Sequence, residues 1–327
     1  MAEYINIRGQ SIEVVASDPA NPTLGQIWYN STSNTLKGEG FRAAAWATVN
    51  SLNTTRTQHG GVGDTSAALA FGGYSSFSPV TITNTTEKYN GTSWTNSNNM
   101  NTTRAGLGAA GIQTAALGFG GYIPAVTPFT GATEEYNGTS WTNSNNLNTN
   151  RNQLSGAGTQ TAALGFGGDL PPSTGATESY DGTSWATSPA SLNTARRYAG
   201  STGIQTAALM FGGNNPGGNT NVTEEYDGIS WANSNPLNTT RQRLGGAGIQ
   251  TAALGWGGQS TVYLGATEEY DGISWATSSA SLNTAINGPV GGGTQTSALG
   301  FGGDDPISAA TEEFTGAGPI TQTITAS

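Results

Sequence analysis

The chain has no cysteine and a single histidine, His59, among its 327 residues. Disulfides, thiolate metal sites and cysteine nucleophiles are therefore excluded, and so is a metal site built from several histidines. A serine–histidine–aspartate triad would have to pass through His59. We therefore expect no catalytic residue, no cofactor and no metal ion, and a function other than that of an enzyme.

Charge is also scarce. Charged residues make up 10% of the chain, and 11 basic against 21 acidic residues give a net charge of −10. Binding of nucleic acid or of an anionic membrane requires a basic surface, so we expect neither partner. No run approaches the 18 or so apolar residues of a membrane span. The N-terminal sequence lacks the apolar core of a signal peptide, so we also expect no secretion signal.

What the sequence has in abundance is an internal repeat with a period of 44–48 residues. The first marker of the repeat is a tryptophan, found at Trp46, Trp94, Trp141, Trp185, Trp231 and Trp275. The second is an aromatic-Gly-Gly triplet, which begins at Phe71, Phe119, Phe166, Phe211, Trp256 and Phe301. Repeats of this length typically form one supersecondary unit each.

Each unit is expected to contain four short strands. The first is rich in small residues, as in Gly156–Gly158, and the second alternates large and small residues, as in Thr161–Phe166. A third strand ends at a residue pair such as Asp181-Gly182, a strong signal for a two-residue hairpin. The fourth strand carries the tryptophan. Four strands with this period are typical of radial blade architectures.

The order of the Gly-Gly pair, the aromatic after the loop, the tryptophan and a following arginine resembles the kelch repeat over about residues 46–314. The resemblance implies an all-β fold, a six-bladed kelch-like β-propeller with four strands per blade. The last unit has no tryptophan after Phe314. We predict that Ala43–Val49 supplies its outer strand and so closes the ring. Residues 1–42 would form an attachment arm and hairpin, and residues 43–327 the propeller.

A glutamate and an arginine recur with the repeat. The glutamates are Glu87, Glu134, Glu178, Glu224, Glu268 and Glu312, and the arginines are Arg56, Arg104, Arg151, Arg196 and Arg241. In the sixth unit we place Ala285 at the arginine position, with Arg42 as a substitute partner for Glu312. One interpretation is a ring of charge for catalysis or ligand binding. The favoured one is a structural pair that satisfies backbone groups, because a device copied in every unit serves packing.

The loops that follow the Gly-Gly pairs differ from unit to unit. Because variable loops on a rigid scaffold commonly carry recognition, they are the candidate contact surface for a partner or a glycan. The candidate residues are Tyr74, Phe77, Tyr122, Phe129, Asp169, Asn214, Asn215, Tyr263, Asp304 and Asp305. The opposite face has only tight turns and is a candidate docking surface.

The N-terminal phrase NPTLGQIWYNSTSNTLKG predicts a hairpin of Gln26–Asn30 with Thr35–Lys37. It resembles a short β-meander common in virion structural proteins of tailed bacteriophages. The strand edges before it are candidates for addition to a neighbouring sheet, and the candidate assembly-arm residues are Tyr4, Ile5, Ile7, Ile12, Val14 and Val15.

Together these features favour a non-enzymatic virion structural protein, a tail, fibre or decoration component made in the host cytoplasm. Its partners would be other virion proteins, further copies of itself, and a host-surface glycan or protein. A carbohydrate-binding, lectin-like propeller is the alternative, and a hydrolase or lyase on the loop face is a third.

Overall fold

The computed structural model describes residues 12–123, 129–304 and 306–324. These residues form strands, turns and loops and no helix, so no helix in the described ranges could cross a membrane. The chain divides into two compact units. The first unit comprises residues 1–44 and 316–327, and the second unit comprises residues 45–315.

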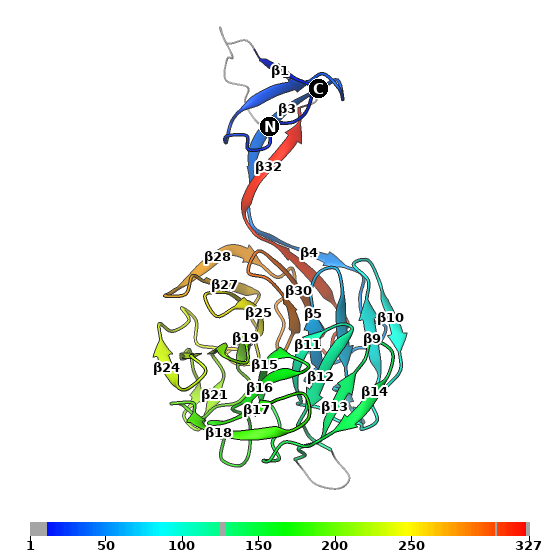
Figure 1. Ribbon diagram of the computed structural model, residues 1–327, viewed down its shortest axis with the longest axis vertical. Helices are drawn as coiled ribbons and strands as arrows, with labels where there is room; N and C mark the ends of the chain where they lie inside the picture. The colour runs from blue at the N-terminus through cyan, green and yellow to red at the C-terminus, as the bar shows by residue number, and fades with distance from the viewer. Residues whose placement is uncertain (1–11, 124–128, 305, 325–327) are drawn as a thin grey trace. The chain divides into compact units, whose positions relative to one another are not determined.

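The described part of residues 45–315 contains six four-stranded antiparallel sheets, numbered 1 to 6 here (Figure 1). Sheet 1 contains β5 (Gly60–Gly63), β6 (Ala68–Phe71), β9 (Thr86–Tyr89) and β10 (Trp94–Ser97). Sheet 2 contains β11 (Gly108–Ile112), β12 (Ala115–Phe119), β13 (Thr133–Tyr136) and β14 (Trp141–Ser144). Sheet 3 contains β15 (Ser155–Thr159), β16 (Ala162–Phe166), β17 (Ala176–Tyr180) and β18 (Trp185–Ser191).

Sheet 4 contains β19 (Gly200–Ile204), β20 (Ala207–Phe211), β23 (Thr223–Tyr226) and β24 (Trp231–Ser234). Sheet 5 contains β25 (Gly245–Ile249), β26 (Ala252–Trp256), β27 (Ala266–Tyr270) and β28 (Trp275–Ser281). Sheet 6 contains β29 (Val290–Gly293), β30 (Ser297–Phe301), β31 (Thr311–Thr315) and β4 (Ala45–Val49). Two loops carry small hairpins, β7 (Tyr74–Phe77) with β8 (Val80–Ile82) and β21 (Asn214–Asn215) with β22 (Gly218–Asn219).

The outer strand of sheet 6 comes from the other end of the repeat region, at the place expected from the sequence. In β4, Trp46 lies opposite Phe314 of β31, and their rings are 5.2 Å apart. The pair repeats the Tyr180–Trp185 register of sheet 3. The tryptophan that precedes the first complete unit therefore completes the last one.

The innermost strands are rich in glycine because they approach one another closely. A Cβ atom on Gly156 of β15 would lie 2.3 Å from the carbonyl oxygen of Ala109 in β11, which no side chain allows. Contacts of this kind join β5, β11, β15, β19, β25 and β29 in sequence, and β29 also contacts β5. The sheets thus succeed one another around a common centre, as in a β-propeller (Figure 1).

The hydrophobic core lies between consecutive sheets. Leu117 and Phe119 of sheet 2 pack with Leu154 and Trp185 of the third repeat, and the Phe119 and Trp185 rings are 4.8 Å apart. The Trp185 indole Nε1 also donates to the Thr133 hydroxyl of sheet 2, at 3.0 Å. A buried tryptophan N–H needs such a partner, and the threonine opposite supplies it.

The same tryptophan–threonine bond occurs in every repeat. Trp141 donates to Thr86, Trp231 to Thr177, Trp275 to Thr223, Trp46 to Thr267 and Trp94 to Thr311. The donor lies in each case one sheet after its acceptor, and Trp94 of sheet 1 donates to sheet 6. The series of bonds therefore returns to the sheet from which it started.

The other unit is a single mixed sheet with the strand order β1 (Glu13–Val15), β2 (Ile27–Asn30), β3 (Thr35–Arg42) and β32 (Gly318–Thr323). The β2–β3 hairpin forms as expected from the sequence. β1 runs parallel to β2 and lies at an edge of the sheet.

The C-terminal segment differs from expectation. The division at residue 43 assigned it to the propeller, but β32 pairs with β3 along its length, with Lys37 opposite Thr323 and Arg42 opposite Gly318. The long β3 strand has one edge occupied by β2 and the other open, and β32 satisfies that open edge. The first unit is therefore built from both ends of the chain.

Candidate functional site

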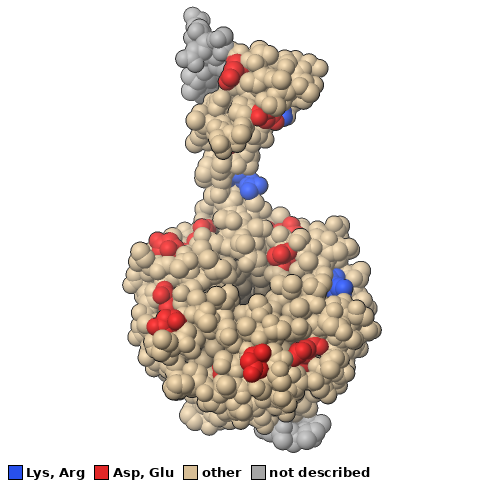
Figure 2. Space-filling model, in the orientation of Figure 1, with Lys and Arg blue, Asp and Glu red and all other residues tan. Residues whose placement is uncertain are grey.

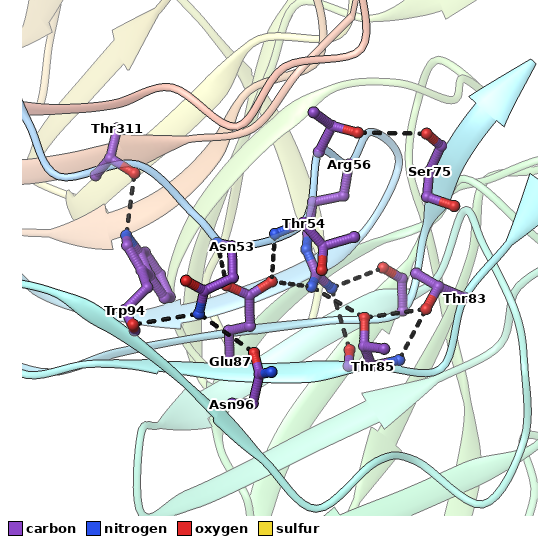
Figure 3. A network of polar contacts seen from close by, with 12 residues as sticks. Asn53, Thr54, Arg56, Ser75, Thr83, Thr85, Glu87, Trp94, Asn96 and Thr311 are labelled. Atoms are coloured by element: carbon purple, nitrogen blue, oxygen red, sulfur yellow. Dashed lines mark hydrogen bonds and ion pairs between the residues drawn. The ribbon is translucent and has the colours of Figure 1, made fainter.

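The five repeated arginines pair with the repeated glutamates as the structural interpretation expects. Arg56 Nη2 lies 2.5 Å from Glu87 Oε1, and both side chains are completely buried (Figure 3). Glu87 also accepts from the backbone N–H groups of Asn53 and Thr54. The carboxylate thereby attaches the loop before β5 to sheet 1. The remaining pairs are Arg104–Glu134, Arg151–Glu178, Arg196–Glu224 and Arg241–Glu268.

Each guanidinium is also held by carbonyl oxygens of its own sheet. Arg241 donates to the carbonyls of Gly257, Ala266 and Gly255, at 3.0, 2.8 and 3.5 Å. Burial lowers the pKa of Arg104 to about 10, against the opposing effect of Glu134. These bonds lie within one repeat and fix a loop to its sheet, so the pairs are part of the scaffold.

The sixth repeat departs from this pattern, and the assignment of its arginine position needs correction. Ile286, and not Ala285, occupies it, because the Ile286 carbonyl accepts from Gly258 as the Arg241 carbonyl accepts from Gly213. Arg42 does not take its place: it lies in β3 of the other unit, where it donates to the carbonyl of Gly316. Among the described residues, the glutamate of this repeat has backbone and amide donors but no ion pair.

The variable loops converge with the loops between sheets on one face, as expected. In each repeat the residue after the Gly-Gly pair forms a bridge with the residue after the arginine position. Tyr74 bridges Thr57, and Asp169 bridges Asn152. The remaining bridges are Tyr122 with Ala105, Asn214 with Arg197, Gln259 with Gln242, and Asp304 with Asn287.

One residue further along the chain, six backbone segments surround the centre of this face. We name these residues the mouth ring: Gln58, Gly106, Gln153, Tyr198, Arg243 and Gly288. Five N–H···O=C bonds connect them in order, from Gly106 N to Gln58 O through to Gly288 N to Arg243 O. All six have positive φ, between 50° and 69°.

Four of these positions carry side chains in a backbone conformation that favours glycine. Gln58, Gln153, Tyr198 and Arg243 account for four of the five non-glycine residues with positive φ among the described residues. Such conformations cost roughly 1–3 kcal/mol each and concentrate at functional sites. The side chains retained here despite that cost mark the mouth ring as a candidate site.

The side chains at the mouth ring contact one another and their neighbours. The Arg243 guanidinium lies 4.2 Å from the centre of the Tyr198 ring and 3.1 Å from Asp304. Arg197 pairs with Asp169 at 2.6 Å. Asp169 and Asp304, two of the three aspartates predicted as contact residues, are thus neutralised by arginines that were not predicted from the sequence.

Tyrosine hydroxyls lie in the same neighbourhood. Burial raises the pKa of Tyr74, the charges of Tyr122 and Tyr198 raise it further, and Arg243 acts in the opposite direction. Tyr74 and Tyr122 also form the bridges to the residues that precede Gln58 and Gly106 in the chain, so both lie next to the mouth ring. Tyrosine and arginine combine apolar surface with hydrogen-bonding groups, which suits them to recognition.

The other predicted contact residues lie in their own loops. Phe77 packs against Tyr74 with ring centres 5.3 Å apart, and Asn215 belongs to the β21–β22 hairpin. Phe129 is half-buried, and Tyr263 bridges Gln259 within its loop. Asp305 lies outside the described residues.

Below the mouth ring lies a channel of about 290 Å³ lined by the small residues of all six innermost strands. Figure 2 shows a hollow at the centre of the second unit, and acidic side chains are scattered over the face that is in view. His59 borders the channel and is 2% exposed, and neither of its ring nitrogens forms a hydrogen bond with a described residue. The described residues therefore form no triad around it, and they contain no cluster of three or more acidic or histidine side chains able to hold a metal.

The structure describes only some of the predicted assembly-arm residues. Tyr4, Ile5 and Ile7 lie outside the described residues. Val14 is the central residue of edge strand β1 and is 66% exposed, and Ile12 lies just before it. Leu24 and Phe41 of the same unit are 67% and 63% exposed.

The mouth ring could have been found in the sequence from one signal. The residue two positions after the arginine position is glutamine, glycine, tyrosine or arginine, whereas the arginine itself recurs in five of the six units. Comparison with known proteins adds no relative, since no protein-family model matches the chain and no curated protein matches it.

Proposed function

We propose that the chain is a non-enzymatic structural protein of a bacteriophage virion, whose second unit is a six-bladed kelch-like propeller closed by β4. The first unit attaches the chain to the particle and to further copies, and the propeller presents the mouth ring to a partner or a host surface. Closure is supported by the contact of β29 with β5 and by the tryptophan–threonine bonds that return to their starting sheet.

The proposal rests mainly on one contrast: the residues that build the scaffold recur in nearly every unit, whereas the residues at the mouth ring vary. Tryptophans, glutamates and inner-strand glycines recur in almost every unit, and the structure uses them for packing. The mouth-ring position varies among the units: it is glutamine in two, glycine in two, and Tyr198 and Arg243 in the remaining two. Proteins that recognise a partner commonly place variable residues on a rigid, regular scaffold in this way.

Attachment through the first unit is supported by its construction. Its described residues form a single sheet with no second layer over it, and domains normally bury each sheet against another layer. Val14, Leu24 and Phe41 are accordingly left exposed. Edge strand β1 also offers unpaired backbone groups to a neighbouring strand. The phrase that resembles phage virion proteins forms the β2–β3 hairpin of this same sheet.

Sedimentation velocity of the full chain tests the attachment role. We expect a defined oligomer at micromolar concentration. Val14→Asp places a charge on the exposed edge strand and should yield monomers with an unchanged near-ultraviolet spectrum. Ile273→Asp, at a similarly exposed position in the β27–β28 turn, is the control and should leave the oligomer intact. A monomeric wild-type chain at all concentrations would contradict this part of the proposal.

A second candidate function, carbohydrate binding, is favoured by the three tyrosines and the amides at the mouth. Rings that stack on sugars and side chains that bind hydroxyl groups are the chemistry of a lectin site. A glycan array probed with the labelled chain tests it. Binding lost in Tyr198→Ala and kept in Ile273→Ala would place a glycan at the mouth, whereas no binding to any glycan would favour a protein partner.

A further inference from the structure

The sixth repeat contains a cavity where the other five repeats hold an arginine. The cavity has a volume of about 210 Å³ and is lined by Ile286, Gly300, Gly302, Ala310 and Glu312, among others. Ile286 does not fill it, because its side chain is directed to Gly303, where a Cβ atom would meet it at 2.6 Å. We name this cavity the arginine slot.

The walls of the arginine slot carry the acceptors that bind a guanidinium elsewhere in the molecule. In sheet 5, Arg241 donates to the carbonyls of Gly257, Ala266 and Gly255 and to Glu268 Oε1. The counterparts in sheet 6 are Gly302, Ala310, Gly300 and Glu312, since Gly302 N donates to Ala310 O as Gly257 N donates to Ala266 O. All four counterparts line the cavity.

The carboxylate of the arginine slot is held in the orientation that an ion pair requires. Glu312 Oε2 accepts from the Asn283 backbone and side-chain amides at 2.8 and 2.9 Å. Oε1, the oxygen that pairs with arginine in the five complete repeats, has a single bond of 3.4 Å from Thr284 N. Glu312 is 6% exposed, whereas the other five glutamates are at most 1% exposed.

From this geometry we infer that the arginine slot binds a guanidinium group supplied from outside the repeat. A buried carboxylate without a counter-charge is costly, and a guanidinium would bring both the charge and the donors for the three carbonyls. Access is available, because Thr284, Ala285 and Pro306 are exposed at the edge of the cavity. The group is either the side chain of an arginine in a partner protein or a small free guanidine.

Calorimetric titration of the full chain with methylguanidinium chloride tests the inference, with methylammonium chloride and sodium chloride at equal ionic strength as references. We expect one site per chain for methylguanidinium and at least tenfold weaker binding of methylammonium. Glu312→Gln should weaken the binding at least tenfold. Ile286→Arg should abolish it and raise the melting temperature, because it restores the missing pair.

Arg241→Ala is the matched control, since it empties the same position in sheet 5 and should raise the stoichiometry from one to two. If Ile286→Arg does not fold, Glu312→Gln decides alone. The inference is overturned if methylguanidinium binds no better than methylammonium, or if its binding survives Glu312→Gln. It is also overturned if methylguanidinium binds only to the Arg42→Ala variant, because an arginine of this chain would then occupy the slot in the wild type.

A blocked Gly-Arg-Gly tripeptide separates the two sources of the guanidinium. Binding of the peptide at least as tight as that of methylguanidinium would identify an arginine presented by a partner protein. Binding of the free ion alone would identify a small guanidine. Gly-Lys-Gly is the control for charge and length, and it should not bind in either case.

Discussion

Replacing His59 by leucine should change how the stability of the second unit depends on pH. His59 is 2% exposed and packs against Phe301 with ring centres 5.7 Å apart, and no residue that the structure describes forms a hydrogen bond with either ring nitrogen. Burial holds its pKa well below the usual 6.5, and the charge of Arg56 lowers it further. The corresponding residue is Leu107 in the second repeat and Leu154 in the third. A leucine side chain therefore fits at this position, because two other repeats have one there.

The sign of the effect follows from proton binding. Below pH 6.5 the unfolded chain binds a proton at His59 that the folded chain does not, so protons favour unfolding. The free energy of unfolding is therefore highest above pH 6.5, where His59 is neutral in both states, and it decreases as the pH falls below 6.5. The loss is about 1.4 kcal/mol for each pH unit until the folded pKa is reached. His59→Leu should also remove the cost of two unpaired nitrogens, about 1–3 kcal/mol at every pH.

Urea unfolding at pH 7.5, 6.5 and 5.5, followed by tryptophan fluorescence, measures both effects. The carboxylates common to the two proteins cancel in the difference between them. We expect His59→Leu to be more stable than the wild type at pH 7.5, by an amount that grows by more than 1 kcal/mol at pH 5.5. A difference that stays constant between pH 7.5 and 5.5 would refute the assignment of a buried neutral histidine. Leu154→His, the converse substitution, should introduce a second pH dependence of the same sign.

Three further substitutions address the scaffold. Glu178→Gln leaves Arg151 buried without its counter-charge and should lower the free energy of unfolding in urea by about 3–5 kcal/mol. Ser179→Ala, at the next residue, should leave that free energy nearly unchanged, and equal effects of the two substitutions would argue against the ion pair. Gln160→Ala removes two bonds to sheet 2 and should cost about 1–3 kcal/mol, seen as a lower melting temperature. Gly156→Ala forces a Cβ atom against the neighbouring inner strand and should lower the yield of folded protein, and a normal yield would contradict the close approach of the inner strands.

The repeat in the sequence predicts most of the second unit because each marker has one physical role. The tryptophan specifies packing and the Gly-Gly pair a close approach in every copy, and the Asp-Gly or Asn-Gly pair specifies a hairpin in the first five. The orphan Trp46 predicts the strand that pairs with β31 for the same reason.

The sequence predictions were wrong or incomplete at positions that the repeat pattern does not cover or mark. Residues 318–323 fall outside the repeat, and their pairing with β3 depends on a strand edge left open in the folded unit. The arginine position of the sixth repeat was misplaced by one residue, because no charged side chain marks it. The mouth ring consists of six residues that are far apart in the chain; the sequence shows that their position varies, but only the fold shows that they meet.

The central claim is that a closed ring of six sheets is held by the first unit and leaves its mouth ring free. Electron cryomicroscopy of the full chain, at a concentration where it self-associates, tests this claim most directly. We predict assemblies in which first units contact one another, each carrying a ring of six sheets whose mouth faces solvent. A ring of five or seven sheets, or a contact between copies that covers Tyr198 and Arg243, would contradict it.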